Sequence, residues 1–206
     1  MNNIVLKKLE DKYFVKNLFY ASTHNAFYTD MYSKFGICDI LVHPELYDKL
    51  MQLKPILKDK KLKLVIFDTF RPLEIQKFMY ENASEALRSY IAPPPVDNNS
   101  KRGHHPRGIA IDCYLIDENN KPLSFPCAPD AFYDGWEKDD NYADYIMKAH
   151  RDYMDCTQEE IDNRDLLENM MLEIGLEPLP TEWWHFNLKN PTSYQLIRSL
   201  NDCVIE

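Results

Sequence analysis

The sequence predicts an α+β fold in a single domain, with a mostly antiparallel sheet packed by helices. Strand-like and helix-like segments are mixed along the 206 residues without the regular βαβ order of a parallel sheet. Residues 108–117 alternate with period 2, which is typical of a strand, and residues 157–160 (TQEE) form a capping box that begins a helix. The length suits one sizeable core, so we expect one domain over residues 1–206.

In the first half of the chain, leucines near helical spacing predict a helix over residues 44–58. Residues 61–69 alternate and then become apolar, which predicts a strand that enters a core. A helix follows over residues 72–90, and Arg71 therefore lies at a strand-to-helix junction, where side chains often face a cleft. Two polar residues near the start of this helix could cap it, Asp68 and Thr69.

The second half contains one further helix and two strands. Residues 92–102 (APPPVDNNSKR) and 121–153 are rich in loop-forming residues, and we expect both to be irregular. The helix that starts at the capping box should end near Gly175, because glycine suits the position after a helix C-terminus. Prolines then precede residues 181–188 (TEWWHFNL), an aromatic segment that predicts a strand.

The strand over residues 108–117 has one face suited to a site. Gly108, Ala110 and Asp112 share this face, because successive side chains of a strand alternate between faces. Two very small residues therefore precede a carboxylate and leave open space above the sheet. His105 lies just before this strand, in a loop that can curl over it.

Composition argues against several classes of protein. The chain has 24 Lys and Arg against 33 Asp and Glu, a formal net charge of −9, which opposes binding to nucleic acid. No apolar run approaches the ~18 residues that cross a bilayer, and charges interrupt the first 20 residues. We therefore expect a cytoplasmic protein without a membrane partner. The five cysteines are widely spaced, which argues against a disulfide framework or a thiolate zinc site.

Two clusters can carry chemistry. Residues 105–112 (HPRGIAID) and 182–185 (EWWH) together offer two imidazoles and two carboxylates, which a catalytic zinc site needs. In such a site three ligands hold the metal, a fourth position keeps a water, and a nearby carboxylate takes a proton from that water.

Some placements within these clusters stay open. Glu182 and His185 would face opposite sides of a flat strand, so we expect Glu182 on the incoming loop and His185 on the strand proper. His104 adjoins His105, and only one of the two should reach a metal, because neighbouring residues of an extended segment point opposite ways. The two residues between Glu182 and His185 should serve packing, Trp183 and Trp184.

These clusters resemble motifs of the zinc D-alanyl-D-alanine dipeptidases, the family of the vancomycin-resistance dipeptidase, which is related to zinc D,D-carboxypeptidases. H-x-x-G-x-A-x-D is followed about 70 residues later by E-W-W-H. Other segments are similar to motifs of that family in the same order, so the resemblance covers nearly the whole chain. They are residues 67–72 (FDTFRP), 90–94 (YIAPP), 163–167 (NRDLL), 180–186 (PTEWWHF), and Tyr20-Ala21-Ser22 with Asn25.

The resemblance implies a cofactor and a set of roles. It implies one zinc ion per chain, with His105, Asp112 and His185 as the ligands. It implies Glu182 as the general base and then the general acid. It also implies Arg71 as the cation that stabilises the tetrahedral oxyanion, which a fixed guanidinium can do without later reorganisation.

The sequence departs from the family pattern at expected substrate contacts. The family has Ser two residues before the first histidine, and that Ser resembles a substrate contact, but the position here is Gly103. Asn25 is followed by Ala-Phe-Tyr in place of Phe-x-Gly, and residues 126–130 lack the usual Met-Gly-Thr. We keep Asp130 as the expected partner of the substrate's free ammonium group and Tyr20 as an expected substrate contact.

We therefore expect a zinc dipeptidase that hydrolyses the D-alanyl-D-alanine dipeptide, its small-molecule partner, to two D-alanines. One alternative is a zinc D,D-carboxypeptidase that trims D-alanine from cell-wall peptides. Another is a zinc-stabilised binding domain that has lost catalysis, but neither Glu182 nor Arg71 is needed merely to hold zinc. Arg71 has an alternative of its own, a structural salt bridge at the strand-to-helix junction.

Overall fold

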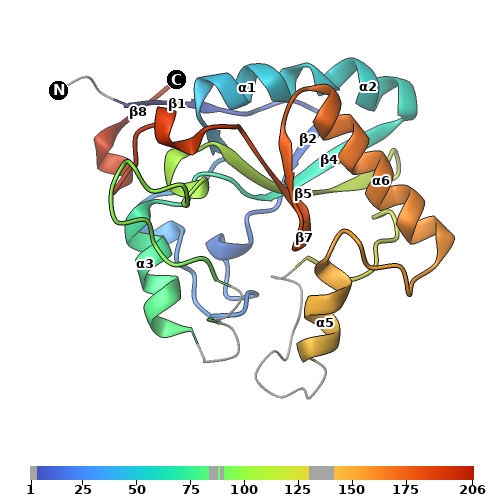
Figure 1. Cartoon of the computed structure of the whole chain (residues 1–206). Coiled ribbons are helices and arrows are strands. Elements are labelled where there is room, and N and C mark those ends of the chain that lie inside the picture. Colours follow the sequence, from blue (N-terminus) through green and yellow to red (C-terminus); the bar gives the residue numbers. More distant parts are fainter. Residues whose placement is uncertain (1–3, 84–87, 89–90, 130–141) are drawn as a thin grey trace.

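Two sheets carry the fold within residues 4–83, 88, 91–129 and 142–206, which the computed structural model describes (Figure 1). Helices pack against the sheets, so the predicted α+β class is confirmed. The strands are β1 (Ile4–Lys8), β2 (Phe14–Lys16), β3 (Leu41–Val42), β4 (Leu62–Asp68), β5 (Ala110–Asp117), β6 (Glu177–Leu179), β7 (Glu182–Asn187) and β8 (Cys203–Ile205).

The larger sheet has the strand order β2-β4-β5-β7-β6. β2 is parallel to β4, and the other three neighbouring pairs are antiparallel, as predicted for most of the sheet. The central strands β4, β5 and β7 are buried along almost their whole length. The period-2 strand of the sequence is thus a central strand, and its polar residues lie inside the molecule.

The smaller sheet has the order β3-β1-β8 and joins the two ends of the described chain. β1 pairs in parallel with β8, so the first and last strands of the described chain lie side by side (Figure 1). The sequence pattern predicted neither this sheet nor β2, because several of these strands have only two or three residues. A period of 2 becomes visible only over about four to eight residues.

Five α-helices are described. Figure 1 shows α1 and α2 along one side of the large sheet, with α3 and α5 on the opposite side of the molecule and α6 beside β6 and β7. They are α1 (Pro44–Met51), α2 (Leu53–Lys60), α3 (Leu73–Asn82), α5 (Tyr142–Ala149) and α6 (Gln158–Glu173). Short 3-10 turns are η1 (Phe19–Ala21), η2 (Ser33–Phe35), η3 (His105–Arg107), η5 (Pro191–Ser193) and η6 (Leu200–Asp202).

The helix predicted over residues 44–58 consists of two helices. α1 ends at Met51 and α2 begins at Leu53. Pro55 explains the break, because it has no N–H to donate to the carbonyl of Met51, four residues earlier. Leucines from both helices are buried, so the apolar face that the spacing indicated is retained.

The helix predicted over residues 72–90 ends earlier. α3 stops at Asn82, and Ala83 has extended backbone angles (φ −67°, ψ 141°). The Asn82 side chain donates to the carbonyl of Phe78, and asparagine in general competes with helical hydrogen bonds in this way. No side chain caps the start of α3, so the predicted caps are wrong, and Asp68 has a different partner.

A helix replaces part of the loop predicted over residues 121–153. α5 occupies Tyr142–Ala149, and its buried Tyr145 and Ala149 are four residues apart on one helical face. The Tyr145 hydroxyl donates to the carbonyl of Ala128. This short apolar face was hidden because the composition was averaged over a long acidic and aromatic segment.

The capping box of α6 is confirmed. The Thr157 Oγ1 accepts a hydrogen bond from the Glu160 N–H, and the Glu160 carboxylate accepts one from the Thr157 N–H. Gly175 follows the helix at φ +80°, the left-handed conformation expected after a C-terminus. Among the helices of the described residues, none combines the length and the apolar character needed to cross a membrane.

Candidate metal centre and its pocket

Three polar side chains lie in a row across the centre of the large sheet. Asp68 of β4 pairs with Asp112 of β5, and Asp112 pairs with His185 of β7. Side chains at directly opposed positions have Cβ atoms about 4.5–5.5 Å apart and share one face of the sheet. Strand register therefore brings together residues that are 44 and 73 positions apart in the chain.

His105 reaches this row from the 3-10 turn η3. The turn ends at Gly108 with φ +65°, and a Cβ on Gly108 would lie 2.9 Å from a Leu6 methyl and 3.1 Å from the backbone nitrogen of His43. Only glycine fits this close approach without displacing its neighbours. The glycine of the motif therefore serves the turn that folds His105 back over β5.

The donor atoms of His105, Asp112 and His185 converge within 4.8 Å of one another, and all three residues are buried. His185 Nδ1 lies 2.8 Å from Asp112 Oδ1, and His105 Nε2 lies 3.2 Å from Asp112 Oδ2. Zinc ligands at about 2.0–2.1 Å in tetrahedral geometry lie roughly 3.3 Å apart. The spacing and the nitrogen and oxygen donor set therefore fit one small divalent cation.

The tautomer of His105 suits metal binding. Its Nδ1 lies 2.6 Å from the backbone carbonyl of Thr69. A carbonyl only accepts, so Nδ1 carries a proton, and in the neutral ring the Nε2 lone pair is left for a metal on the side of Asp112. Metal-ligating histidines in general donate their other N–H to such an acceptor, which fixes the orientation of the ring.

The neighbouring charges of this cluster shift the pKa values of Asp112 and His105. Burial raises the pKa of Asp112, but the two histidines beside it lower this pKa by a larger amount. The net pKa of Asp112 is therefore below its usual range. Burial lowers the pKa of His105, but Asp112 raises it, and the net pKa is above its ordinary value of 6.5. The carboxylate is thus held ionised, as a metal ligand must be.

Glu182 lies beside this cluster because β7 is irregular. Pro178 of β6 pairs with Phe186, and Leu179 pairs with Glu182, so adjacent positions of β6 face positions of β7 that are four residues apart. This bulge turns Glu182 toward the same side as His185, and the Glu182 Oε2 lies 3.9 Å from the His185 Nδ1. Glu182 is the first residue of β7, which corrects the prediction that it lies in the preceding loop.

Arg71 lies where the strand-to-helix junction predicted, and it is 8% exposed. Its Nε donates to Asp68 Oδ2 at 2.9 Å, its Nη2 also contacts Asp68 Oδ2, and its Nη1 donates to Gln76 Oε1 at 2.9 Å. Burial opposes the charge of Arg71, but Asp68 raises its pKa well above the ordinary value. Arg71 Nη2 also lies 4.0 Å from Asp112 Oδ2, so this cation borders the cluster of His105, Asp112 and His185.

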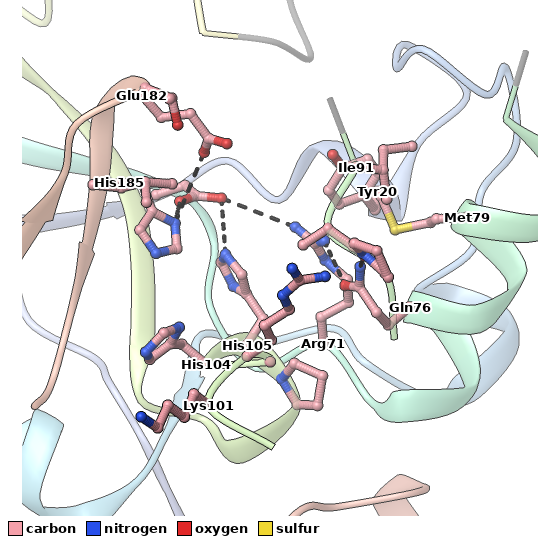
Figure 2. A pocket seen from close by; sticks show the side chains of 18 residues that line it. Tyr20, Arg71, Gln76, Met79, Ile91, Lys101, His104, His105, Glu182 and His185 are labelled. Carbon is pink, nitrogen blue, oxygen red and sulfur yellow. Dashed lines mark hydrogen bonds and ion pairs between the residues drawn. The ribbon is translucent and has the colours of Figure 1, made fainter. Parts of the chain in front are cut away.

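These side chains line one cavity of about 400 Å³. Figure 2 shows Glu182 and His185 on one side, Arg71, Tyr20 and Gln76 on the other, and His105 between them. Apolar side chains such as Met79 and Ile91 complete the wall. The chemistry-bearing residues of two distant sequence motifs thus share one pocket.

The remaining predicted residues have different outcomes. Tyr20 lines the cavity, and its ring lies 5.3 Å from the Arg71 guanidinium carbon. Asp130 lies outside the described residues. His104 also lines the cavity but is not part of the three-residue cluster, and burial with the nearby histidines lowers its pKa to about 4. Trp183 and Trp184 are fully buried, as packing residues should be.

The partners of Asp68 did not follow from the sequence pattern. Asp68 is completely buried, and besides Arg71 it accepts hydrogen bonds from the Tyr32 hydroxyl and the Thr69 N–H. Burial keeps the pKa of Tyr32 well above its ordinary value, so this hydroxyl stays a donor. The sequence does place a carboxylate at the end of an apolar strand, three residues before an arginine, and this pattern could have indicated the buried ion pair of Asp68 and Arg71.

Comparisons with known proteins agree on one family. Residues 14–202 match the family described as D-ala-D-ala dipeptidase. The chain is also similar to the D-alanyl-D-alanine dipeptidase of Escherichia coli K12, with 27% identity over 165 residues. That alignment covers 80% of this chain and 75% of the relative.

Proposed function

This chain belongs to the D-Ala-D-Ala dipeptidase family, and from that premise we propose that it is a zinc dipeptidase that hydrolyses D-alanyl-D-alanine to two D-alanines. The observation that carries the proposal is the convergence of His105, Asp112 and His185 beside Glu182 and Arg71 in one cavity. A peptidase of this kind needs a metal site, a proton carrier and a fixed cation in reach of one peptide bond.

The metal in this proposal is one zinc ion held by His105, Asp112 and His185. Two imidazoles and one carboxylate form a ligand set typical of catalytic zinc, and the three donors leave a coordination position open. When bound, zinc would polarise the substrate carbonyl and lower the pKa of a bound water to about 7.

Glu182 acts as the proton carrier. Its Oε2 lies beside the cluster without being one of the three converging donors. The carboxylate takes a proton from the attacking water as the water oxygen bonds to the carbonyl carbon. It then gives that proton to the amide nitrogen as the C–N bond breaks, so one alanine leaves as an amine and the other as an acid.

Arg71 stabilises the oxyanion. A guanidinium has five N–H donors, and the contacts with Asp68 and Gln76 use three of them. The remaining N–H groups can donate to the oxygen that becomes negative, and the buried pair with Asp68 holds the guanidinium in place beforehand. The salt bridge and the catalytic role of Arg71 are therefore compatible.

As part of the same proposal, the protein acts in the cytoplasm on a small dipeptide and has neither nucleic acid nor a membrane as a partner. The net charge of −9 supports this in one respect, because a phosphate backbone would be repelled. Tyr20 contacts the substrate from the wall beside Arg71. Asp130 is proposed as the partner of the substrate ammonium group.

The experiment is product analysis with zinc-loaded protein. Four substrates are compared: D-Ala-D-Ala, L-Ala-L-Ala, a mixed L,D-dipeptide, and a longer peptide that ends in D-Ala-D-Ala. We expect D-alanine to be released from the D,D-dipeptide only. Equal cleavage of the longer peptide would favour a D,D-carboxypeptidase, and no cleavage of any substrate would favour a binding domain.

A further inference from the structure

One wall of the cavity includes residues 101–103, at the end of a loop, and carries two cations. Lys101 and Arg102 both line the cavity, and within the part of the chain that the structure describes neither has an ion-pair partner. Arg71 differs from them, because Asp68 already balances its charge. Figure 2 shows Lys101 next to His104, on the other side of His105 from Glu182. The cavity therefore holds unbalanced positive charge away from its proton carrier.

This wall is a built feature of the fold. Arg107 is completely buried, and its guanidinium forks between backbone carbonyls. Each of its three nitrogens donates hydrogen bonds, and most of the acceptors belong to the loop over residues 98–103. The acceptors are the carbonyls of Asn98, Ser100, Arg102, Gly103 and Tyr194. The backbone that carries the two cations is thus positioned by buried hydrogen bonds.

Gly103 has no side chain with which to contact a ligand. Its φ is +79°, and a Cβ at this position would lie 2.6 Å from Cγ of Pro95. A serine here would need a strained backbone and would meet the proline ring, which cannot rotate away. Side-chain contacts from this part of the loop to a ligand must therefore come from the residues next to Gly103.

We propose that Lys101 and Arg102 form the subsite that binds the C-terminal carboxylate of the substrate. This inference rests on the proposed function, because a free dipeptide is a zwitterion whose carboxylate needs a cation within the pocket. Both side chains are exposed, so they can attract an incoming anion as well as hold it. Arg102 presents a planar fork that matches a carboxylate, and Lys101 adds a second charge.

The test compares D-Ala-D-Ala with its C-terminal amide, which differs only in the charge of that group. Calorimetry measures both dissociation constants on zinc-loaded Glu182→Gln protein, and the ratio of the two kcat/KM values is measured with Glu182 intact. The test variants are Lys101→Gln, Arg102→Gln and the double variant, which keep side-chain length. Matched controls are Lys58→Gln and Arg198→Gln, two exposed cations outside the cavity wall.

We expect the preference for the acid over the amide to fall at least about fivefold in the double variant and to stay constant in both controls. Zinc content and melting temperature should not change in any of these proteins. A preference that stays within twofold of the starting protein, or equal affinity of that protein for acid and amide, overturns the subsite. Absence of D-Ala-D-Ala turnover in the wild type refutes the proposed function instead, because the calorimetric ratio does not depend on turnover.

Discussion

Replacement of Arg71 by alanine should reduce both stability and catalysis, because the structure gives this side chain two tasks. Its guanidinium pairs with Asp68, which is completely buried, and it borders the cavity beside Asp112. Arg71→Ala would leave the Asp68 carboxylate in the interior without its cation. Melting temperature alone therefore cannot separate a structural Arg71 from a catalytic one.

The size of the stability loss follows from what Asp68 keeps. Removal of one partner of a buried ion pair costs about 3–5 kcal/mol of unfolding free energy. Asp68 retains the Tyr32 hydroxyl and the Thr69 N–H as donors, which favours the lower end, about 3 kcal/mol. For a chain of this size each kcal/mol lowers the melting temperature by about 2–4 °C, so we expect a fall of roughly 6–12 °C.

The assay combines calorimetric melting with kinetics on D-Ala-D-Ala, measured well below the melting temperature of each variant. Loss of one oxyanion donor lowers kcat by about 10²–10³-fold. The double variant Asp68→Asn with Arg71→Ala should melt above Arg71→Ala, because asparagine leaves no unpaired charge, while its kcat stays low. Arg198→Ala, an exposed arginine, serves as the matched control for both readouts.

Two results would refute this reasoning. A melting temperature of Arg71→Ala within 2 °C of the wild type would mean that the pair with Asp68 contributes little. Recovery of kcat in the double variant would mean that Arg71 acts only through the fold, as a structural salt bridge.

Four further outcomes are expected. Glu182→Gln should keep zinc and lose about 10²–10⁴-fold in kcat. If the Glu182→Gln protein were free of zinc, Glu182 would be a metal ligand and not only a proton carrier. His105→Ala should contain no zinc when its metal content is measured by elemental analysis, and full occupancy of the zinc site in this variant would refute the ligand set. Zinc affinity, measured by competition with a chromophoric chelator, should fall at least about fourfold from pH 8 to pH 6, because the metal-free pKa of His105 is above its ordinary 6.5 and a protonated ring cannot ligate. Gly103→Ser should lower the unfolding free energy by about 1–3 kcal/mol through its positive φ and its contact with Pro95, and an unchanged melting temperature would contradict that strain.

Short-range patterns in the sequence predicted the elements that carry the site. Alternation predicted β5 and most of β4, and the aromatic segment after two prolines predicted β7. The capping box predicted the start of α6. These signals are local, since period and capping depend on residues a few positions apart, and each remained valid in the folded protein. The prediction that two small residues before Asp112 leave open space above the sheet was wrong, because Gly108 lies in the turn before β5 and packs against Leu6 and His43.

The sequence by itself therefore determined which residues could carry the chemistry, and the tertiary structure decided how they meet. Register across β4, β5 and β7 aligned Asp68 with Asp112 and His185, which no local pattern can specify because strand pairing is a long-range interaction. A bulge in β7 turned Glu182 toward His185, where simple alternation predicted opposite faces. The pairing of Asp68 with a buried arginine was decided in the same way, because an unpaired charge cannot stay in the interior and its partner is selected only when the chain is packed.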